Sequence, residues 1–214
     1  MCADFESGTI EKQAANCSGT GDAGIESGQA HSGQKALHIA GGGGYCNHIF
    51  ARWPLANAPS ELWVRYWIRV GSPLGPEHVT FMAMKDEADG PKDLRMGGQS
   101  SILMFNRESD DATLPALSPT GISLSRPLKT STWMCIEIHL DQAAGTLSSY
   151  LDGELVPGLV LDGVATNDID QQWFNKKWRP SLSDLRLGWE SYGGPVNDLW
   201  FDDLVVSRNR AGCQ

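Results

Sequence analysis

The sequence has no long apolar run and very little helical periodicity. No stretch approaches the roughly 18 consecutive apolar residues of a membrane span, so we expect no transmembrane segment. Positive charge is also scarce, because 17 Lys and Arg residues face 26 Asp and Glu residues and the formal net charge is −9. The electrostatic field of a protein with this negative net charge does not attract nucleic acid or an anionic membrane, so we expect neither as a partner.

Cysteine is sparse and lacks the spacing of a metal site. None of the five cysteines forms a CxxC pair or lies in a histidine cluster, which disfavours zinc. Two disulfides and one spare thiol are the simpler account, and they indicate an oxidising compartment. Cys2 is the expected spare thiol, either free, paired between chains or carrying a lipid. No signal peptide is present, which is compatible with a secreted, extracellular protein whose leader has been removed.

Short alternating segments dominate the rest of the sequence. In Leu62–Val70, apolar residues alternate strictly with Trp and Arg, which is typical of a half-buried strand. Further strands are expected at 31–39, 78–84, 133–140, 146–151, 154–156, 185–192 and 199–207, with a strand entry at 4–7 and a hairpin turn at 152–153. We expect a polar loop at 17–28, a glycine loop at the rim of a sheet at 41–44, and weak helical turns at 167–173 and 181–184. This pattern predicts one all-β domain, residues 1–214, of two packed antiparallel sheets.

The second face of Leu62–Val70 carries a row of aromatic and basic residues. Trp63, Arg65, Trp67 and Arg69 share this face. An exposed row of this kind suits sugar rings and acidic groups. The alternative is that Trp63 and Trp67 lie under a loop.

The stretch Leu94–Asp111 carries an unusually polar face for a mid-sheet strand. Without a bulge, Arg95, Gln99 and Arg107 lie on one side of the strand. Arg, Gln and Asn side chains at this spacing can hold a carboxylate by planar hydrogen bonding. The pair Gly97 and Gly98 leaves room for a ligand or for another backbone. The alternative is an exposed sheet face with solvated charges.

A buried carboxylate is predicted in the last strand. Asp202 shares its face with apolar neighbours, and an inward carboxylate is costly unless it is paired or bound to a cation. Glu6 and Ser32 offer further hard oxygen ligands, a set that suits calcium rather than zinc. The alternative is a hydrogen-bonded structural aspartate.

Four segments resemble a known family along nearly the whole chain. They are AHSGQKALHIAGGGGYCNHIF, HVTFMAMKD, LRMGGQSSILMFNRESDDATLPALSP and LWFDDLVVSRNRAGC. They resemble the cellulose-induced secreted proteins of filamentous fungi and their bacterial relatives, which are similar in turn to fungal glucuronan lyases. The Arg-x-Gly-Gly-Gln and Asn-Arg-Glu-Ser-Asp-Asp blocks are specific motifs of this resemblance.

The resemblance implies a β-jelly roll of the concanavalin A-like lectin and glucanase type, with an open cleft on a concave sheet. It implies a structural calcium ion at Glu6, Ser32 and Asp202, and disulfides joining Cys17 to Cys46 and Cys135 to Cys213. The matching cleft positions are His48, Arg95, Gln99, Asn106, Arg107, Asp111 and Tyr192. In one departure, Asp93 stands where the resemblance leads us to expect a histidine, so any part of that histidine in proton transfer would be lost here.

The leading hypothesis is a lyase that cleaves a uronic-acid polysaccharide of the glucuronan type by β-elimination. Arg95 and Gln99, assisted by Asn106, would neutralise the substrate carboxylate. Tyr192 and His48 are the candidates for proton transfer. Each residue has an alternative, non-catalytic role: Tyr192 as a binding platform and His48 as a structural hydrogen-bond donor.

Two other functions use different residues. A carbohydrate-binding module without turnover would use the rings of Trp63, Trp67 and Trp189 together with the arginines, in plant biomass degradation. A glycoside hydrolase would need two carboxylates in one cleft, for which Glu137 and Glu190 are the candidates. In each case the expected partner is an acidic or plant cell-wall polysaccharide and the expected state is a monomer.

Overall fold

The structure is a computed structural model that describes residues 1–14, 21–56, 58–109, 112–114, 124–164 and 177–214, apart from the side chains of 14, 46 and 112–114. One antiparallel sheet has eight strands, in the order β13 (Glu154–Leu161), β12 (Thr146–Leu151), β11 (Trp133–Asp141), β6 (Glu61–Val70), β15 (Asn197–Ser207), β4 (Lys35–Gly41) and β3 (Gly21–Ser27), with β1 (Cys2–Ala3) beside β15. The other has seven, in the order β10 (Ala112–Leu114), β9 (Ile102–Arg107), β8 (Lys92–Gln99), β7 (Val79–Asp86), β14 (Asp184–Tyr192), β5 (Tyr45–Pro54) and β2 (Glu11–Ala14). A short 3-10 helix, η1 (Glu87–Asp89), follows β7.

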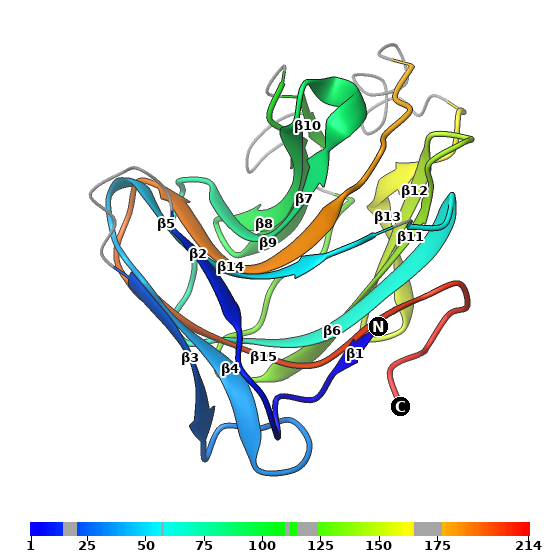
Figure 1. The fold of residues 1–214 in the computed structure, drawn as a ribbon. Helices are drawn as coiled ribbons and strands as arrows, with labels where there is room; N and C mark the ends of the chain where they lie inside the picture. The colour runs from blue at the N-terminus through cyan, green and yellow to red at the C-terminus, as the bar shows by residue number, and fades with distance from the viewer. Residues whose placement is uncertain (15–20, 57, 110–111, 115–123, 165–176) are drawn as a thin grey trace.

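The two sheets pack face to face in the jelly-roll arrangement, as the sequence predicts (Figure 1). The chain crosses repeatedly from one sheet to the other, so neighbouring strands within a sheet come from distant parts of the sequence. Among the described helices, none is long and apolar enough to cross a membrane.

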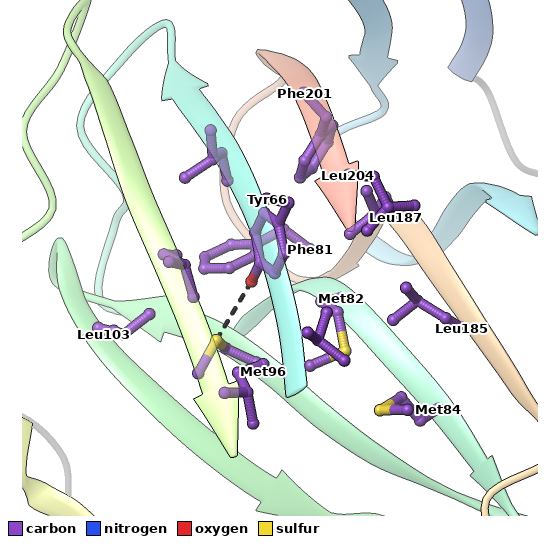
Figure 2. Packing of buried hydrophobic residues seen from close by; sticks show 14 of the residues in the cluster. Tyr66, Phe81, Met82, Met84, Met96, Leu103, Leu185, Leu187, Phe201 and Leu204 are labelled. Carbon is purple, nitrogen blue, oxygen red and sulfur yellow. Dashed lines mark hydrogen bonds between the residues drawn. The ribbon is translucent and has the colours of Figure 1, made fainter. Parts of the chain in front are cut away.

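The strict alternation in β6 is confirmed, because each apolar side chain is buried and each Trp or Arg is only partly buried. Its inner residues meet the inner residues of β7, β8 and β14 from the opposite sheet (Figure 2). The Tyr66 hydroxyl donates to Met96 Sδ at 3.2 Å and so links the two sheets inside the core. Burial raises the pKa of Tyr66 well above its ordinary value, so this hydroxyl keeps its proton.

Most expected strands are present, and four segments differ. Residues 21–27, expected as a polar loop, form β3, because Ala23 packs into the core while the polar side chains face outward. The expected strand at 31–39 begins only at Lys35, and 4–7 is a bend rather than a strand entry. Residues 181–184 are extended rather than helical, whereas 167–173 lie outside the described residues.

The glycine run 41–44 lies at the rim and joins β4 of one sheet to β5 of the other, as expected. It also seats a tryptophan, because a Cβ on Gly41 would lie 2.5 Å from the Trp189 ring. Trp189 Nε1 donates to the Gly42 carbonyl at 2.8 Å, and the residue is only 1% exposed. The expectation that Trp189 binds sugar is therefore wrong, since its face of β14 points into the core.

One disulfide fastens the C-terminus. Cys135 of β11 is bonded to Cys213, as the family resemblance implies, and Cys2 is an exposed free cysteine. The expected pair Cys17 and Cys46 lies outside the described residues and side chains.

A two-residue turn sets the register of β8 and β9. Ser100 and Ser101 both have positive φ, so Gln99 pairs with Ile102 and Arg95 pairs with Asn106. Directly paired residues lie on the same side of a sheet. Asn106 therefore joins Arg95 and Gln99, whereas Arg107 faces the opposite side and is 6% exposed. The expected grouping of Arg107 with Arg95 is wrong because the turn shifts the alternation by one residue.

The glycine pair of β8 makes room for another backbone. A Cβ on Gly97 would lie 1.7 Å from the Val79 carbonyl oxygen. We expect Gly97→Ala to lower the free energy of unfolding by about 2–4 kcal/mol, because β7 and β8 must separate locally. Chemical denaturation measures this change.

Gly24→Ala is the matched control. It lies in β3, where a new Cβ meets no described atom within 4 Å. It should leave stability unchanged or raise it by about 0.5–1 kcal/mol. Equal stabilities for the two variants would contradict the close approach at Gly97.

Candidate functional site

A cavity of about 420 Å³ opens on the outer side of the seven-stranded sheet, on the face opposite the core. It is lined by Tyr45, Glu77, His78, Val79, Thr80, Arg95, Gly97, Met104, Asn106, Glu108 and Tyr192. These residues come from β5, β7, β8, β9 and β14 and the segments beside them, so neighbouring strands supply the floor. We call this cavity the Arg95 pocket.

The guanidinium of Arg95 is held between two carboxylates. Its Nη2 lies 3.3 Å from Glu108 Oε1, and its Nε lies 3.5 Å from Glu190 Oε2. Its Cζ lies 5.5 Å from the centroid of the Tyr192 ring, which places the cation over the aromatic face. The Arg95 side chain is 12% exposed, so it is fixed within the wall of the pocket.

Glu190 connects Arg95 to His48, and its Oε1 lies 3.4 Å from His48 Nδ1. Burial acts to raise the pKa of Glu190. Hydrogen bonds from His48 and Tyr192 and the charge of Arg95 outweigh burial, so the net pKa is lowered and Glu190 is ionised at neutral pH. His48 is thus oriented by a carboxylate at the side of the pocket.

The Tyr192 hydroxyl keeps its proton in this arrangement. Burial and the neighbouring charge of Glu190 raise the pKa of its hydroxyl far above the ordinary value. The hydroxyl is therefore protonated at neutral pH. A hydroxyl that holds its proton this firmly is a weak acid, so it can give the proton only to an oxygen that becomes strongly basic as a bond breaks.

Gln99 orients a histidine that sequence reasoning did not single out. Gln99 Nε2 donates to the Pro76 carbonyl at 2.5 Å, and Gln99 Oε1 lies 3.1 Å from His78 Nε2. Because this amide oxygen can only accept, neutral His78 carries its proton on Nε2 and leaves Nδ1 as an acceptor. His78 lines the pocket, so Gln99 acts on the site through it.

The other expected binding residues have different positions. Asn106 lines the pocket beside Arg95, and Arg107 lies on the opposite face of the sheet. Asp111 lies outside the described residues. Glu77 and Glu108 line the pocket although they were not expected there; the acidic turn after Arg107 was the available signal for Glu108.

Asp93, which departs from the family pattern, is paired with Arg186 of β14. Arg186 is 5% exposed and also contacts Asp184, which pairs in turn with Arg52 at 2.9 Å, so two arginines and two aspartates neutralise one another. Asp93 is therefore held as a counter-ion beside the pocket. The same backbone segment is fixed by the Asp93 amide, which donates to Glu108 Oε2 at 2.9 Å.

The tryptophans of β6 lie on the other sheet. Trp67 stacks on His31, with ring centroids 3.6 Å apart, and Trp63 stacks on His139 at 4.4 Å. Trp67, expected to bind substrate, is not part of the Arg95 pocket, because β6 belongs to the eight-stranded sheet and its outer face points away from that pocket. The alternative, a position under a loop, fits Trp67, since His31 lies in the loop before β4, whereas Trp63 stacks on a residue of strand β11.

The two carboxylates expected for a glycoside hydrolase are on different sheets. Glu137 of β11 is fully buried and forms an ion pair with Arg210 at 2.7 Å, beside the disulfide. Glu190 lies on the outer face of β14 in the other sheet. The hydrolase hypothesis is therefore wrong for this pair, because the carboxylates do not face a common cleft.

The residues expected at a calcium site gather around the loop 31–35. Glu6 Oε1 accepts the amides of Gln34 and Lys35, at 2.7 and 2.8 Å. Asp202 is fully buried as expected, but it pairs with Trp67 on the outer face of the sheet, because a register shift follows it and separates it from the inward-facing Val206. It accepts three backbone amides, including those of His31 and Ser32 at 2.8 and 3.2 Å. These hydrogen bonds satisfy the buried carboxylate in part. Carboxylate and hydroxyl oxygens from the two ends of the chain fit calcium by donor type. Within the described part of the chain, no group of three or more His, Cys, Asp or Glu side chains forms a metal cluster.

Two antiparallel sheets with a polar pocket on the outer face of one define a β-jelly roll with an open site. The model of the Cip1-like core domain, of the polysaccharide lyase-like group, matches residues 3–209, and the chain belongs to this family. The solved structure of a cellulose-induced protein, Cip1, is 40% identical, with 100% of both chains covered and a TM-score of 0.91.

Other solved structures are more distant. An endo-β-1,4-glucuronan lyase from the fungus Trichoderma reesei is 13% identical over 98% of this chain and 95% of its own, with a TM-score of 0.66. The binding domain of botulinum neurotoxin serotype G is 10% identical over 99% of this chain and 48% of its own, with a TM-score of 0.56. Both show the fold alone. Comparison with curated protein sequences gave no match.

The lowered pKa of Glu190 predicts a pH-dependent contribution to stability. A carboxylate whose folded pKa is depressed stabilises the fold above its ordinary value of 4.5 and loses this contribution as the pH falls further. We expect Glu190→Gln to reduce the acid dependence of the melting temperature below that pH. Thermal melts of both proteins across the acidic range measure the difference.

Glu154→Gln is the control for this measurement. The Glu154 side chain is 70% exposed and lies on the opposite sheet. It should leave the acid dependence unchanged, because an exposed ion pair contributes little. Parallel acid profiles for wild type and Glu190→Gln would show that Glu190 is not stabilised as an anion.

Proposed function

We propose that this protein is a polysaccharide lyase that cleaves a uronic-acid-containing chain, of the glucuronan type, by β-elimination in the Arg95 pocket. One observation carries the proposal. A fixed cation, a proton-retaining tyrosine and a histidine with a free acceptor nitrogen surround one open cavity. Membership of the Cip1-like polysaccharide lyase-like family supports the same chemistry.

In the proposed reaction, a base removes the proton from C5 of a uronic acid unit. The electron pair of the broken C–H bond forms a double bond between C4 and C5, and the C4–O bond breaks. The departing oxygen takes up a proton. Charge develops on the carboxyl group at C6, so hydrogen-bond donors aimed there lower the barrier.

The pocket supplies a candidate for each role. Nδ1 of His78 is the proposed base, held in its tautomer by Gln99. The Tyr192 hydroxyl is the proposed acid, kept protonated by burial and by Glu190. Arg95 and Asn106 are the proposed donors to the carboxyl group, and His48 positions Glu190.

A second function is a carbohydrate-binding module without turnover. The aspartate at position 93 favours it, since the family pattern has a histidine there, and Asp93 is taken up by its ion pair with Arg186. Tyr45 also favours it, because its ring is 74% exposed at the edge of the pocket and can stack on a sugar.

Ultraviolet absorbance of the unsaturated product distinguishes the two functions. We expect absorbance to rise when the protein meets polyglucuronate, and Tyr192→Phe should lower kcat about 10²–10⁴-fold because it removes the general acid. Tyr150→Phe, on the eight-stranded sheet, is the matched control and should retain wild-type activity. Retention of polysaccharide with unchanged chain length, over a broad pH range with calcium present, would instead identify a binding module.

We further propose that calcium binds at Glu6, Ser32 and Asp202 in a structural role. The support is the gathering of oxygen donors from both ends of the chain around the loop 31–35. The disulfide Cys135–Cys213 supports the related proposal that the protein acts outside the cell, where such bonds persist.

Calcium removal tests the structural role. Because a ligand that binds only the folded state stabilises it, we expect calcium to raise the melting temperature and a chelator to lower it. Asp202→Asn should abolish the calcium response. A melting temperature that is the same in excess calcium and in excess chelator would leave Asp202 as a hydrogen-bonded structural residue.

A further inference from the structure

The Arg95 pocket is acidic for a site that receives a uronic acid. Among the described residues that line it, Arg95 is the permanent cation and Glu77 and Glu108 are anions. Glu190 adds a third carboxylate in contact with Arg95. The charges nearest to an incoming sugar therefore favour a neutral group over an anion.

Arg95 already forms ion pairs with two carboxylates, although its buried Nε has no hydrogen-bond partner among the described residues. Glu108 and Glu190 lie 3.3 and 3.5 Å from its guanidinium, on two different nitrogens. Lys92 is half exposed, and its Nζ lies 3.9 Å from Glu108, so it offsets that carboxylate only weakly. A free substrate carboxylate would have to compete with these carboxylates and lie close to them.

An esterified carboxyl group avoids both the repulsion by the pocket carboxylates and the competition with them for Arg95. It carries no charge, and its carbonyl accepts hydrogen bonds from neutral donors such as the Asn106 amide. An ester also withdraws electrons from C5 more strongly than a carboxylate, so the C5 proton is more acidic. The bonds made and broken are those of the proposed β-elimination, and the ester itself stays intact.

We propose that the Arg95 pocket takes uronic acid units whose carboxyl group is esterified in preference to units whose carboxyl group is free. This inference rests on the proposed lyase function and names its substrate class. In this assignment Arg95 keeps its carboxylate partners and polarises the ester carbonyl, while Glu77 and Glu108 disfavour the free acid.

The experiment compares one uronic acid polymer in two forms, with free and with methyl-esterified carboxyl groups, at neutral pH. Initial rates are taken from product absorbance, with protein-free controls for spontaneous elimination of the ester. We expect the ester to be cleaved at least tenfold faster at low ionic strength, with the difference narrowing as salt screens the repulsion. A free acid cleaved as fast as the ester would overturn this inference and leave the lyase function in place. Cleavage of neither form would overturn both.

Charge-neutral variants test the cause of the selectivity. Glu77→Gln and Glu108→Gln each remove one anion from the pocket, so each should raise the rate on the free acid relative to the ester several-fold. Two variants are used because Glu108 also holds the Asp93 amide, whereas Glu77 lies in the segment before β7. Glu154→Gln on the other sheet makes the same change in net charge and should leave the ratio unchanged. An unchanged ratio in both pocket variants would show that these carboxylates do not select the substrate.

Discussion

The contact between the apolar inner faces of the two sheets determines the register of the strands, and through it which side chains face the pocket. Each fully buried aliphatic or aromatic side chain contributes about 1.5–3 kcal/mol, so the register of each strand is fixed by its apolar positions. In β8 these are Leu94 and Met96, and the residues between them must face outward. Arg95 reaches the pocket for this reason. A slip of one residue would turn its charge toward the apolar core, where burial of an unpaired charge is costly.

The outer face of the seven-stranded sheet is consequently a surface of fixed charges. Arg186 lies between Asp93 and Asp184, and Arg95 lies between Glu108 and Glu190. Partly buried charges are tolerated when they are paired, and removing one partner leaves the other uncompensated. The pairs therefore hold the floor of the pocket in one arrangement before any ligand arrives. Such preorganisation is what electrostatic catalysis requires.

Sequence periodicity predicted the scaffold well because burial imposes it directly, as the alternation of β6 shows. It failed where the geometry between strands determines which side of the sheet a residue faces and which distant residues it contacts. The turn at Ser100 and Ser101 reverses the side on which Arg107 lies, and nothing in a period-2 pattern reveals this. Trp189 looks like a sugar platform in the sequence, yet it fills the space that the glycine run leaves open. His78 was missed because only the folded chain brings it to Gln99, 21 residues away.

The fold alone does not decide between chemistry and binding, since jelly rolls of similar shape include both a lyase and a toxin binding domain. The pocket offers a sharper argument. A surface that only binds sugar needs rings and hydrogen bonds, and it gains nothing from a tyrosine whose proton is held by burial and by a neighbouring carboxylate. Nor does it need an amide that fixes the tautomer of a histidine in the same cavity. A tyrosine that keeps its proton and a histidine whose tautomer is fixed by an amide lie around one cation in this partly buried site. Their joint presence supports the proposed elimination.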